Sequence, residues 1–301
     1  MIAELQNTDT QLHRLGAQRQ LYATAKLVYG WQVVLGGPIA IVGAVFVLCR
    51  PEFKVYAATW GLIVALCDFF WLTPWQRELR SNAARIQEAF DCDVLGLKWN
   101  DLKAGHFPDP ELVTAQSTRY ERWAERMPTL MNWYSPCVDE LPLHVGRIIC
   151  QRANCWWDSI QRRHYAAWIL GIATSVFVVV CGFSLVGGAS LEGLLLKGIL
   201  PLAPVLLIAF RQFAEQREAA DRLDRLKRHC ETIWKAALSG ETRSALTDMS
   251  RNLQDEIFDN RRKAPPVLDF IFRRVRNEYE IGMNNAAAYY IAEAKSALSI
   301  T

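Results

Sequence analysis

The sequence lacks the short motifs that mark most enzymes. Its 301 residues contain no glycine-rich phosphate loop, no nucleophile elbow and no HExxH zinc motif. Each of these motifs holds a phosphate, a nucleophile or a metal at a fixed backbone position. Because none is present, we expect a protein that is not an enzyme.

The eight cysteines lack the paired short spacings of a structural zinc site. Cys150 and Cys155, with His144 and His164 nearby in the sequence, form the one arrangement that leaves zinc open. We favour the alternative, in which the cysteines outside the apolar segments are reduced thiols that pack as small apolar groups. The residues therefore predict neither a metal nor a cofactor.

Charge is almost absent from four long apolar segments. They are 27–49, 55–75, 166–186 and 191–210. A helix needs roughly 20 apolar residues to cross a hydrocarbon core about 30 Å thick, and each segment is long enough. The short stretches 50–54 and 187–190 join the segments in pairs. We therefore predict two transmembrane hairpins, 27–75 and 166–210, and favour them over buried core helices.

The two hairpins leave three long segments, 1–26, 76–165 and 211–301, on the same side of the membrane. Basic residues flank the spans on that side, whereas only Arg50 and Lys54 lie on the opposite side. By the positive-inside rule, the long segments and both termini are expected in the cytoplasm. The first apolar segment begins too late and is too long for a typical signal peptide.

Charged side chains also occur inside the apolar segments. At about 1.5 Å per residue, Asp68 lies about 20 Å and Lys197 about 9 Å from the outer end of its helix, so we do not expect them to pair. Two interpretations stay open: these residues line a pore, or their side chains extend to the headgroups. The stretch Gly36–Pro38 interrupts the first segment, which suits a bundle that rearranges.

The cytoplasmic segments are mostly helical by their apolar periodicity. The predicted helices cover 76–89, 111–128, 143–165, 211–238, 242–260 and 267–298. Residues 90–97 (FDCDVLGL) read as a short extended or turn segment. Apolar residues from Ala219 to Ala237 repeat at heptad spacing, so this helix packs on its own domain or, alternatively, on a second subunit. The expected fold is an all-α membrane protein, with four transmembrane helices in two hairpins and a helical cytoplasmic domain built from the middle and C-terminal segments.

Two clusters combine arginine with aromatic or amide side chains. The first is IICQRANCWWDSIQRRHY (148–165), and the second is IFDNRRKAPPVLDFIFRRVRNEYE (257–280). Guanidinium groups bind phosphates and aromatic rings stack on bases, so together the clusters would form a pocket for a small anionic nucleotide. A formal net charge of only +3 argues against long nucleic acid. The alternative is that these side chains pack inside the domain or contact anionic lipid.

Three stretches of the chain resemble the SMODS-associated four-transmembrane (S-4TM) effector family of bacterial cyclic-oligonucleotide-based anti-phage signalling (CBASS). They are FDCDVLGLKWN (90–100), NWYSPCVDELPLHVGRIICQRANCWWDSIQRRHY (132–165) and LQDEIFDNRRKAPPVLDFIFRRVRNEYEIGM (253–283). The resemblance covers nearly the whole chain. It implies a pore-forming effector of the inner membrane, which acts when it senses a cyclic di- or trinucleotide made by a partner nucleotidyltransferase.

The resemblance and the two clusters together define a hypothetical nucleotide site. Its residues are Trp99, Asn100, Gln151, Arg152, Trp156, Trp157, Arg162, Arg261, Arg262, Arg273 and Arg276. Four helices from one chain enclose little space, so we expect a homo-oligomer in contact with membrane lipids.

Two other functions stay open. A constitutive ion channel or transporter would use Asp68 and Lys197 and would need no cytoplasmic ligand. A membrane scaffold without a pore would use its basic clusters to bind anionic lipids.

Overall fold

The computed structural model describes residues 1–39, 42–43, 46, 50–122, 129–188 and 190–299. For the helical residues 196–198 and 269–278, and for a few single residues of the long helices, it describes the backbone alone. Every regular element in this part of the chain is a helix, so the predicted all-α class is confirmed.

The described part of the chain contains eleven α-helices. They are α1 (Ile2–Leu5), α2 (Asp9–Gly36), α4 (Lys54–Cys67), α5 (Thr73–Leu95), α6 (Asp101–Ala104), α7 (Pro110–Glu121), α8 (Leu143–Val186), α9 (Leu191–Gly193), α10 (Leu200–Leu238), α11 (Arg243–Lys263) and α12 (Asp269–Leu298). Two π-helical segments, η2 (Asp68–Leu72) and η5 (Leu194–Ile199), lie between α-helices without a break, and two short 3-10 turns are η1 (Pro51–Phe53) and η4 (Pro136–Glu140).

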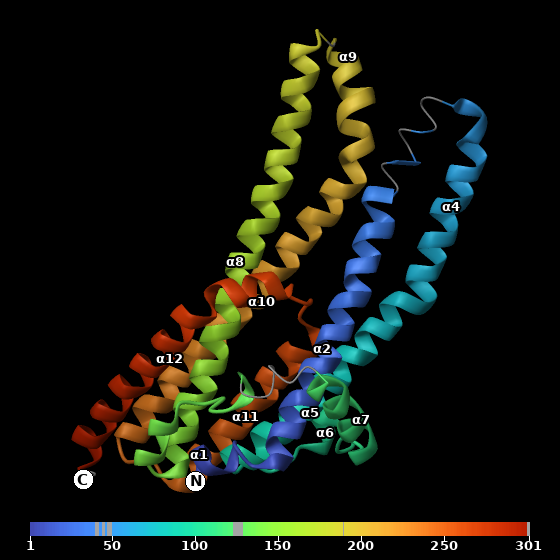
Figure 1. Cartoon of the computed structure of the whole chain (residues 1–301). Coiled ribbons are helices and arrows are strands. Elements are labelled where there is room, and N and C mark those ends of the chain that lie inside the picture. Colours follow the sequence, from blue (N-terminus) through green and yellow to red (C-terminus); the bar gives the residue numbers. More distant parts are fainter. Residues whose placement is uncertain (40–41, 44–45, 47–49, 123–128, 189, 300–301) are drawn as a thin grey trace.

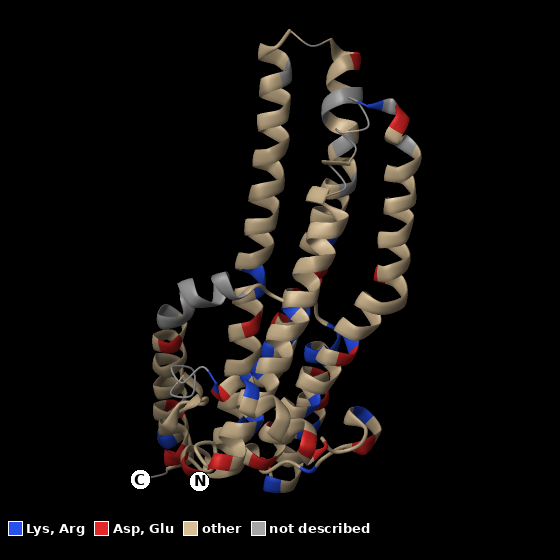
Figure 2. Cartoon of the chain, turned by 45° about the vertical axis from the view of Figure 1, so that its right-hand side comes forward, with Lys and Arg blue, Asp and Glu red and all other residues tan. Residues whose placement is uncertain are grey.

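The helices form a packed base from which two pairs of arms extend. In Figure 1 the upper half of α8 stands beside α9 and the start of α10, while the upper end of α2 stands beside α4. Both termini lie at the base, far from the tips of the arms. Figure 2 shows Lys, Arg, Asp and Glu concentrated in the base, whereas the arms carry very few of them.

Long uninterrupted helices join the base to the arms. The helix α8 has 44 residues and α10 has 39, and each has an apolar half and an amphipathic half. The predicted helices 143–165 and 211–238 are the lower halves of these elements, as expected. The chain from Lys54 to Leu95 also stays helical throughout, because α4, η2 and α5 follow directly on one another.

The base buries one large apolar core. Its largest fully buried side chains include Phe90 of α5, Tyr134 after α7, Ile148 of α8 and Ile233 of α10. The heptad-spaced face of α10 belongs to this core. Of the two interpretations of that face, the structure supports packing within the chain.

Residues 90–95 of the segment FDCDVLGL are helical, so the prediction of an extended or turn segment was wrong for them. The helix α5 continues to Leu95, and Gly96 ends it with a positive φ of 62°. In this left-handed conformation, which favours glycine, the Leu97 N–H donates to the carbonyl of Cys92 at 2.8 Å. Within this helix Asp91 is fully buried, and its charge is neutralised by Arg261, which is far away in the sequence.

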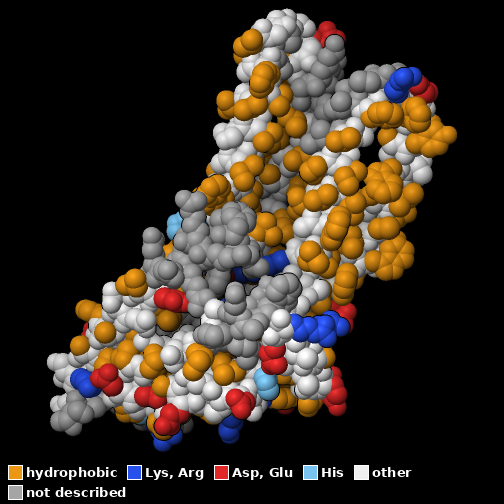
Figure 3. Space-filling view, viewed as in Figure 1, with side chains coloured by type: hydrophobic (Ala, Val, Ile, Leu, Met, Phe, Trp, Pro, Cys, Tyr) orange, Lys and Arg blue, Asp and Glu red, His pale blue; other side chains and the backbone are white. Residues whose placement is uncertain are grey.

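The arms present apolar surface outward. Two helical stretches, Val55–Leu95 and Leu143–Phe183, are long and apolar enough to cross a membrane. Their most apolar windows are 0% and 11% buried, which sets them apart from core helices of a soluble domain. Figure 3 shows the hydrophobic side chains that cover both pairs of arms. Apolar surface of this extent marks a membrane or a partner interface.

The other two predicted spans have more irregular structure. The helix α2 ends at Gly36, at the predicted interruption, and several of residues 40–49 lie outside the described part. The segment 191–210 is divided among α9, η5 and α10.

Candidate functional site

A cavity of about 1230 Å³ lies between the two pairs of arms, above the base. Residues of α2, α4, η2, α5 and α10 line its walls, and the end of α11 with the linker that follows it lines the floor. Figure 3 shows this hollow, with Lys or Arg side chains visible deep inside it. No other cavity of comparable size is found in the described part of the chain.

The cavity is apolar toward the arm tips and polar toward the base. Its apolar walls include Ile39, Val42, Trp60 and Val64. Its polar lining residues near the base are Gln76, Arg77, Arg80, Arg211, Gln212, Glu215, Glu218, Arg222, Asn260 and Lys263. We call this polar set the cavity floor.

Three helices hold the linker Ala264–Pro266 at the floor. Arg80 of α5 donates from Nη1 to the carbonyl of Ala264 at 2.8 Å, and Arg162 of α8 donates to that of Pro265 at 2.9 Å. Gln216 of α10 donates from Nε2 to the carbonyl of Pro266 at 2.9 Å. The two prolines have no N–H to offer, so these carbonyls are the linker's main hydrogen-bonding groups there.

Arg80 is charged in an environment that disfavours the charge. Burial lowers its pKa from the ordinary value, and the positive charges of Arg77 and Arg162 add to the lowering. The Nε atom of Arg80 is buried and has no hydrogen-bond partner among the described residues. An additional negative charge at the floor would therefore be favoured.

Asn260, in the last turn of α11, is fully buried, and both atoms of its side-chain amide lack partners among the described residues. The side-chain oxygen of Gln212, also on the floor, lacks a partner too. Leaving a buried polar group unpaired costs about 1–3 kcal/mol, so such groups need an explanation.

A buried polar network joins α5 to α11 below the cavity. Arg261 pairs with Asp91 at 2.5 Å, and Arg251 pairs with Glu88 at 2.6 Å. Gln254 donates to both carboxylates at 2.9 Å. Burial and the neighbouring Asp91 carboxylate raise the pKa of Glu88, while the Arg251 guanidinium opposes this.

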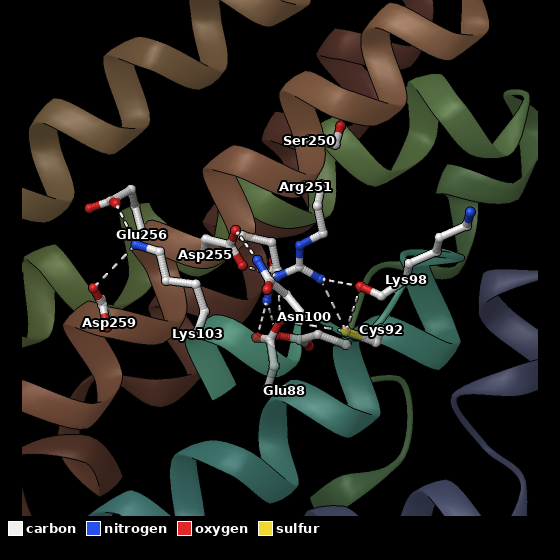
Figure 4. A network of polar contacts seen from close by, with 12 residues as sticks. Glu88, Cys92, Lys98, Asn100, Lys103, Ser250, Arg251, Asp255, Glu256 and Asp259 are labelled. Atoms are coloured by element: carbon white, nitrogen blue, oxygen red, sulfur yellow. Dashed lines mark hydrogen bonds and ion pairs between the residues drawn. The ribbon is translucent and has the colours of Figure 1, made fainter. Parts of the chain in front are cut away.

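Figure 4 shows the outer side of this network, where Arg251 points toward Glu88, Cys92 and the Lys98 carbonyl. Asn100, one of the predicted site residues, points toward Asp255 and donates to it at 2.8 Å.

Several predicted nucleotide ligands are engaged inside the base. Gln151 is fully buried and donates to the carbonyl of Ser250 at 2.8 Å. Arg261 is held by Asp91, and Arg162, besides Pro265, binds Asp158 and Gln216. These side chains are occupied by intramolecular partners.

The other predicted ligands lie at separate places. Trp156 and Trp157 both pack on Tyr279 of α12, with ring centroids 5.8 and 5.6 Å apart from it. A Cβ atom at Gly282 would lie only 3.0 Å from Trp156, so a glycine there allows α12 to approach the ring. Arg152 lies over the ring of Tyr290 at 4.7 Å, next to Trp156 at a crevice of about 10 Å³.

Trp99 donates to the carbonyl of Gly105 at 2.9 Å. Arg262 lies over Phe258 and pairs with Asp259 at 3.1 Å. The side chains of Arg273 and Arg276 are outside the described residues. None of the predicted ligands with a described side chain lines the large cavity, and the structure does not bring them into one pocket.

The polar residues predicted within the membrane have different outcomes. Asp68 lines the cavity and accepts a hydrogen bond from Gln32 of α2 at 2.6 Å. Lys197 lies in η5, and only its backbone is described. Cys150 and Cys155 are free, buried thiols, and in the described part no three His, Cys, Asp or Glu side chains are grouped as metal ligands.

Sequence reasoning missed Asn260, Arg80 and Gln216 as candidates. In the sequence, Arg80 is one of several basic residues that flank the spans, and nothing sets it apart from the others. Asn260 directly precedes the RRKAPP stretch (261–266). Its spacing from Leu253 and Ile257 places it on the apolar face of α11, and this was the one sign in the sequence that Asn260 is buried.

Comparison with known proteins extends this picture. Residues 1–290 match the family model of the SMODS-associating 4TM effector domain. The chain is 22% identical over 233 residues to a probable CBASS effector molecule of Bacillus cereus (strain VD146). The aligned region covers 74% of this chain and 76% of the relative. No solved structure matches the chain. Because the family model covers nearly its whole length, the chain belongs to the SMODS-associating 4TM effector family and is an anti-phage defence effector.

Proposed function

We propose that this effector is activated by a cyclic nucleotide and disrupts the bacterial inner membrane, which stops the infected cell before phage mature. The family and the probable CBASS effector among its relatives support a place in a cyclic-oligonucleotide signalling system. In this proposal a partner nucleotidyltransferase makes the cyclic di- or trinucleotide, and several copies of the chain assemble into the pore.

The proposal places segments 27–49, 55–75, 166–186 and 191–210 across the membrane as two hairpins. The arms support it, because both pairs extend in one direction from the base and expose apolar side chains (Figures 1 and 3). The base and both termini would then lie in the cytoplasm, on the side that carries most of the Lys and Arg.

One observation carries the proposal furthest: α5, α8 and α10 each hold the linker Ala264–Pro266 and each continues toward an arm. A ligand changes a conformational equilibrium only through a difference in affinity for the two states. A ligand that binds differently when the linker is held and when it is released would therefore change the angle between the arms.

The π-helical segments fit this mechanism. Segments η2 and η5 lie within the arms, and η2 begins at Asp68. Single π-helical turns inside α-helices frequently occur at functional sites, because they shift the register of the hydrogen bonds by one residue. In our proposal the arms rearrange at these two positions.

Several residues predicted from sequence keep partial exposure and stay candidates for contact with the nucleotide: Trp99, Asn100, Arg152, Trp156, Trp157 and Arg262. Gln151 and Arg261 would need the base to open before they reached a ligand, because their bonds hold α5, α8 and α11 together.

The test is leakage from dye-loaded liposomes that contain the purified full-length chain. We expect one member of a panel of cyclic di- and trinucleotides to release dye, and the others to release little. Leakage without any nucleotide would instead support a constitutive channel. Liposome binding that falls with salt, without leakage under any condition, would support a scaffold for anionic lipids.

A further inference from the structure

We propose that the cavity floor is a phosphodiester-binding site in which Asn260 is the central polar contact. The inference rests on the proposed function, because it places the phosphate of the activating ligand. It is carried by a fully buried amide that lines a cavity and has neither donor nor acceptor satisfied within the described chain.

The amide of Asn260 is not used by the linker that follows it. The Ala264 N–H donates to the backbone carbonyl of Asn260 at 2.8 Å, which leaves the side chain for another partner. Its Nδ2 atom offers two donors and its Oδ1 atom accepts. A phosphodiester oxygen would satisfy the donors, and a hydroxyl or a base N–H on the same ligand would satisfy the acceptor.

The charges around the cavity favour an anion. Five Lys or Arg residues line it against three carboxylates. Three of the five are paired: Arg211 with Glu215 at 2.9 Å, Arg222 with Glu218 at 3.4 Å, and Lys263 with Asp259 at 3.5 Å. Among the described residues Arg77 forms no ion pair.

The size of the cavity fits a ligand larger than a free phosphate. Its volume of about 1230 Å³ exceeds the ~300–1,000 Å³ of most small-molecule pockets. Two kinds of molecule carry a phosphodiester beside a larger apolar or aromatic body. A cyclic nucleotide would place its bases against the walls, and an anionic phospholipid would place its acyl chains between α2 and α4.

Binding at the floor would act on the linker directly. Arg80 donates to the carbonyls of Lys263 and Ala264, at 3.4 and 2.8 Å, and is also a floor residue. A phosphodiester would compete with these carbonyls for the guanidinium, because charge-assisted bonds to phosphate are the stronger ones. Ligand binding would thereby weaken the hold of α5 on the linker.

The experiment compares Asn260→Ala and Arg77→Ala with two matched controls. Asn252→Ala removes an exposed asparagine from the same helix, and Arg225→Ala removes an exposed arginine from α10. Each full-length variant, purified in detergent, is tested for binding of cyclic di-AMP, cyclic di-GMP, cyclic GMP–AMP and cyclic tri-AMP by calorimetry. Phospholipid that co-purifies with each variant is quantified by mass spectrometry. Circular dichroism checks that each variant is folded.

Four results are distinguishable. A tenfold or larger loss of nucleotide affinity in both floor variants, with controls unchanged, supports the site with a nucleotide as its ligand. Unchanged nucleotide binding with at least twofold less co-purified anionic phospholipid supports the site with a lipid headgroup instead. If both floor variants bind nucleotide and retain phospholipid like the wild type, the inference is overturned, while nucleotide-triggered leakage would leave the proposed function standing. If the wild type binds no nucleotide, and the floor variants retain less phospholipid than the wild type, the proposed function fails and the phosphodiester site remains.

Discussion

Arg162 and Gln216 face each other across α8 and α10 and form a hydrogen bond of 2.8 Å. Each of them also binds one carbonyl of the proline pair that joins α11 to α12, at 2.9 Å. The two longest helices of the protein are therefore tied to each other and to the same linker, at the level where the base ends and the arms begin.

Substituting Gln216 tests whether release of the linker activates the effector. Gln216→Met removes both bonds of this buried amide and should lower the free energy of unfolding by about 1–3 kcal/mol. On our mechanism it also raises leakage from dye-loaded liposomes in the absence of nucleotide. Gln161→Met, on the neighbouring surface of α8, is the control and should leave leakage unchanged. Basal leakage equal to the wild type in Gln216→Met would show that the linker does not restrain the arms.

The ion pair between Arg261 and Asp91 should matter far more to stability than an exposed pair. Asp91 is fully buried, so Asp91→Ala leaves the Arg261 charge without a partner and should cost about 3–5 kcal/mol. Lys103→Ala breaks the pairs of this partly exposed lysine with Glu256 and Asp259, seen in Figure 4, and should cost less than about 1 kcal/mol. Denaturant unfolding followed by tryptophan fluorescence measures both. Similar losses in the two variants would contradict this assignment.

Asn260→Leu should separate stability from response. Replacing an unpaired buried amide by an apolar side chain of similar size removes its desolvation cost, so the ligand-free protein should unfold at the same temperature or higher. Nucleotide-triggered leakage should nevertheless be lost. A thermal scan compares the melting temperatures of Asn260→Leu and Asn252→Leu, the second at an exposed position of the same helix. A clear drop in the melting temperature of Asn260→Leu would mean that its amide has satisfied partners in the free protein.

Asp224 makes part of the stability dependent on pH. Burial alone would raise the pKa of Asp224, but hydrogen bonds from Ser159 and Arg163 and the charge of Arg163 outweigh it and hold the pKa below its ordinary value of 3.8. A carboxyl whose pKa is lowered in the folded state stabilises the fold above its unfolded pKa, and this contribution is lost as the pH falls through the folded pKa. Asp224→Asn should thus melt below the wild type at pH 7.

The same comparison at lower pH provides the check. The difference in melting temperature between the two proteins should shrink as the pH falls below about 3.8. A difference that is the same at pH 7 and pH 3 would mean that the side chain contributes by shape rather than by charge.

Asp68 distinguishes the proposed effector from a constitutive channel. Asp68 accepts a hydrogen bond from Gln32 at 2.6 Å, and Asn at this position keeps an acceptor oxygen. We therefore expect Asp68→Asn to retain nucleotide-triggered leakage within about twofold. Loss of all flux in Asp68→Asn, with Arg77→Ala still active, would favour the channel.

Sequence periodicity predicted the helices but not what their polar residues do. The apolar residues of 143–165, 211–238 and 242–260 repeat at helical spacing, and these segments are helical as predicted. Asp91 and Arg261 are 170 residues apart, so no local pattern reveals that one neutralises the other. Gln151 is 99 and 103 residues from its partners Ser250 and Gln254 on α11, so its role is hidden from local patterns too. Some arginines that were predicted as phosphate ligands, such as Arg261, instead neutralise buried carboxylates of the same chain. Almost nothing in the sequence indicated that the Asn260 side chain is unpaired.

The length of α8 determines how much motion the base must supply. From Arg162 to the end of the helix at Val186, the chain rises about 36 Å at ~1.5 Å per residue. A rigid rod of that length, tilted by about 5° at its lower end, moves its tip by roughly 3 Å, which is about the diameter of a water molecule. A small tilt of α8 at the proline linker therefore produces a larger displacement at the outer ends of the arms.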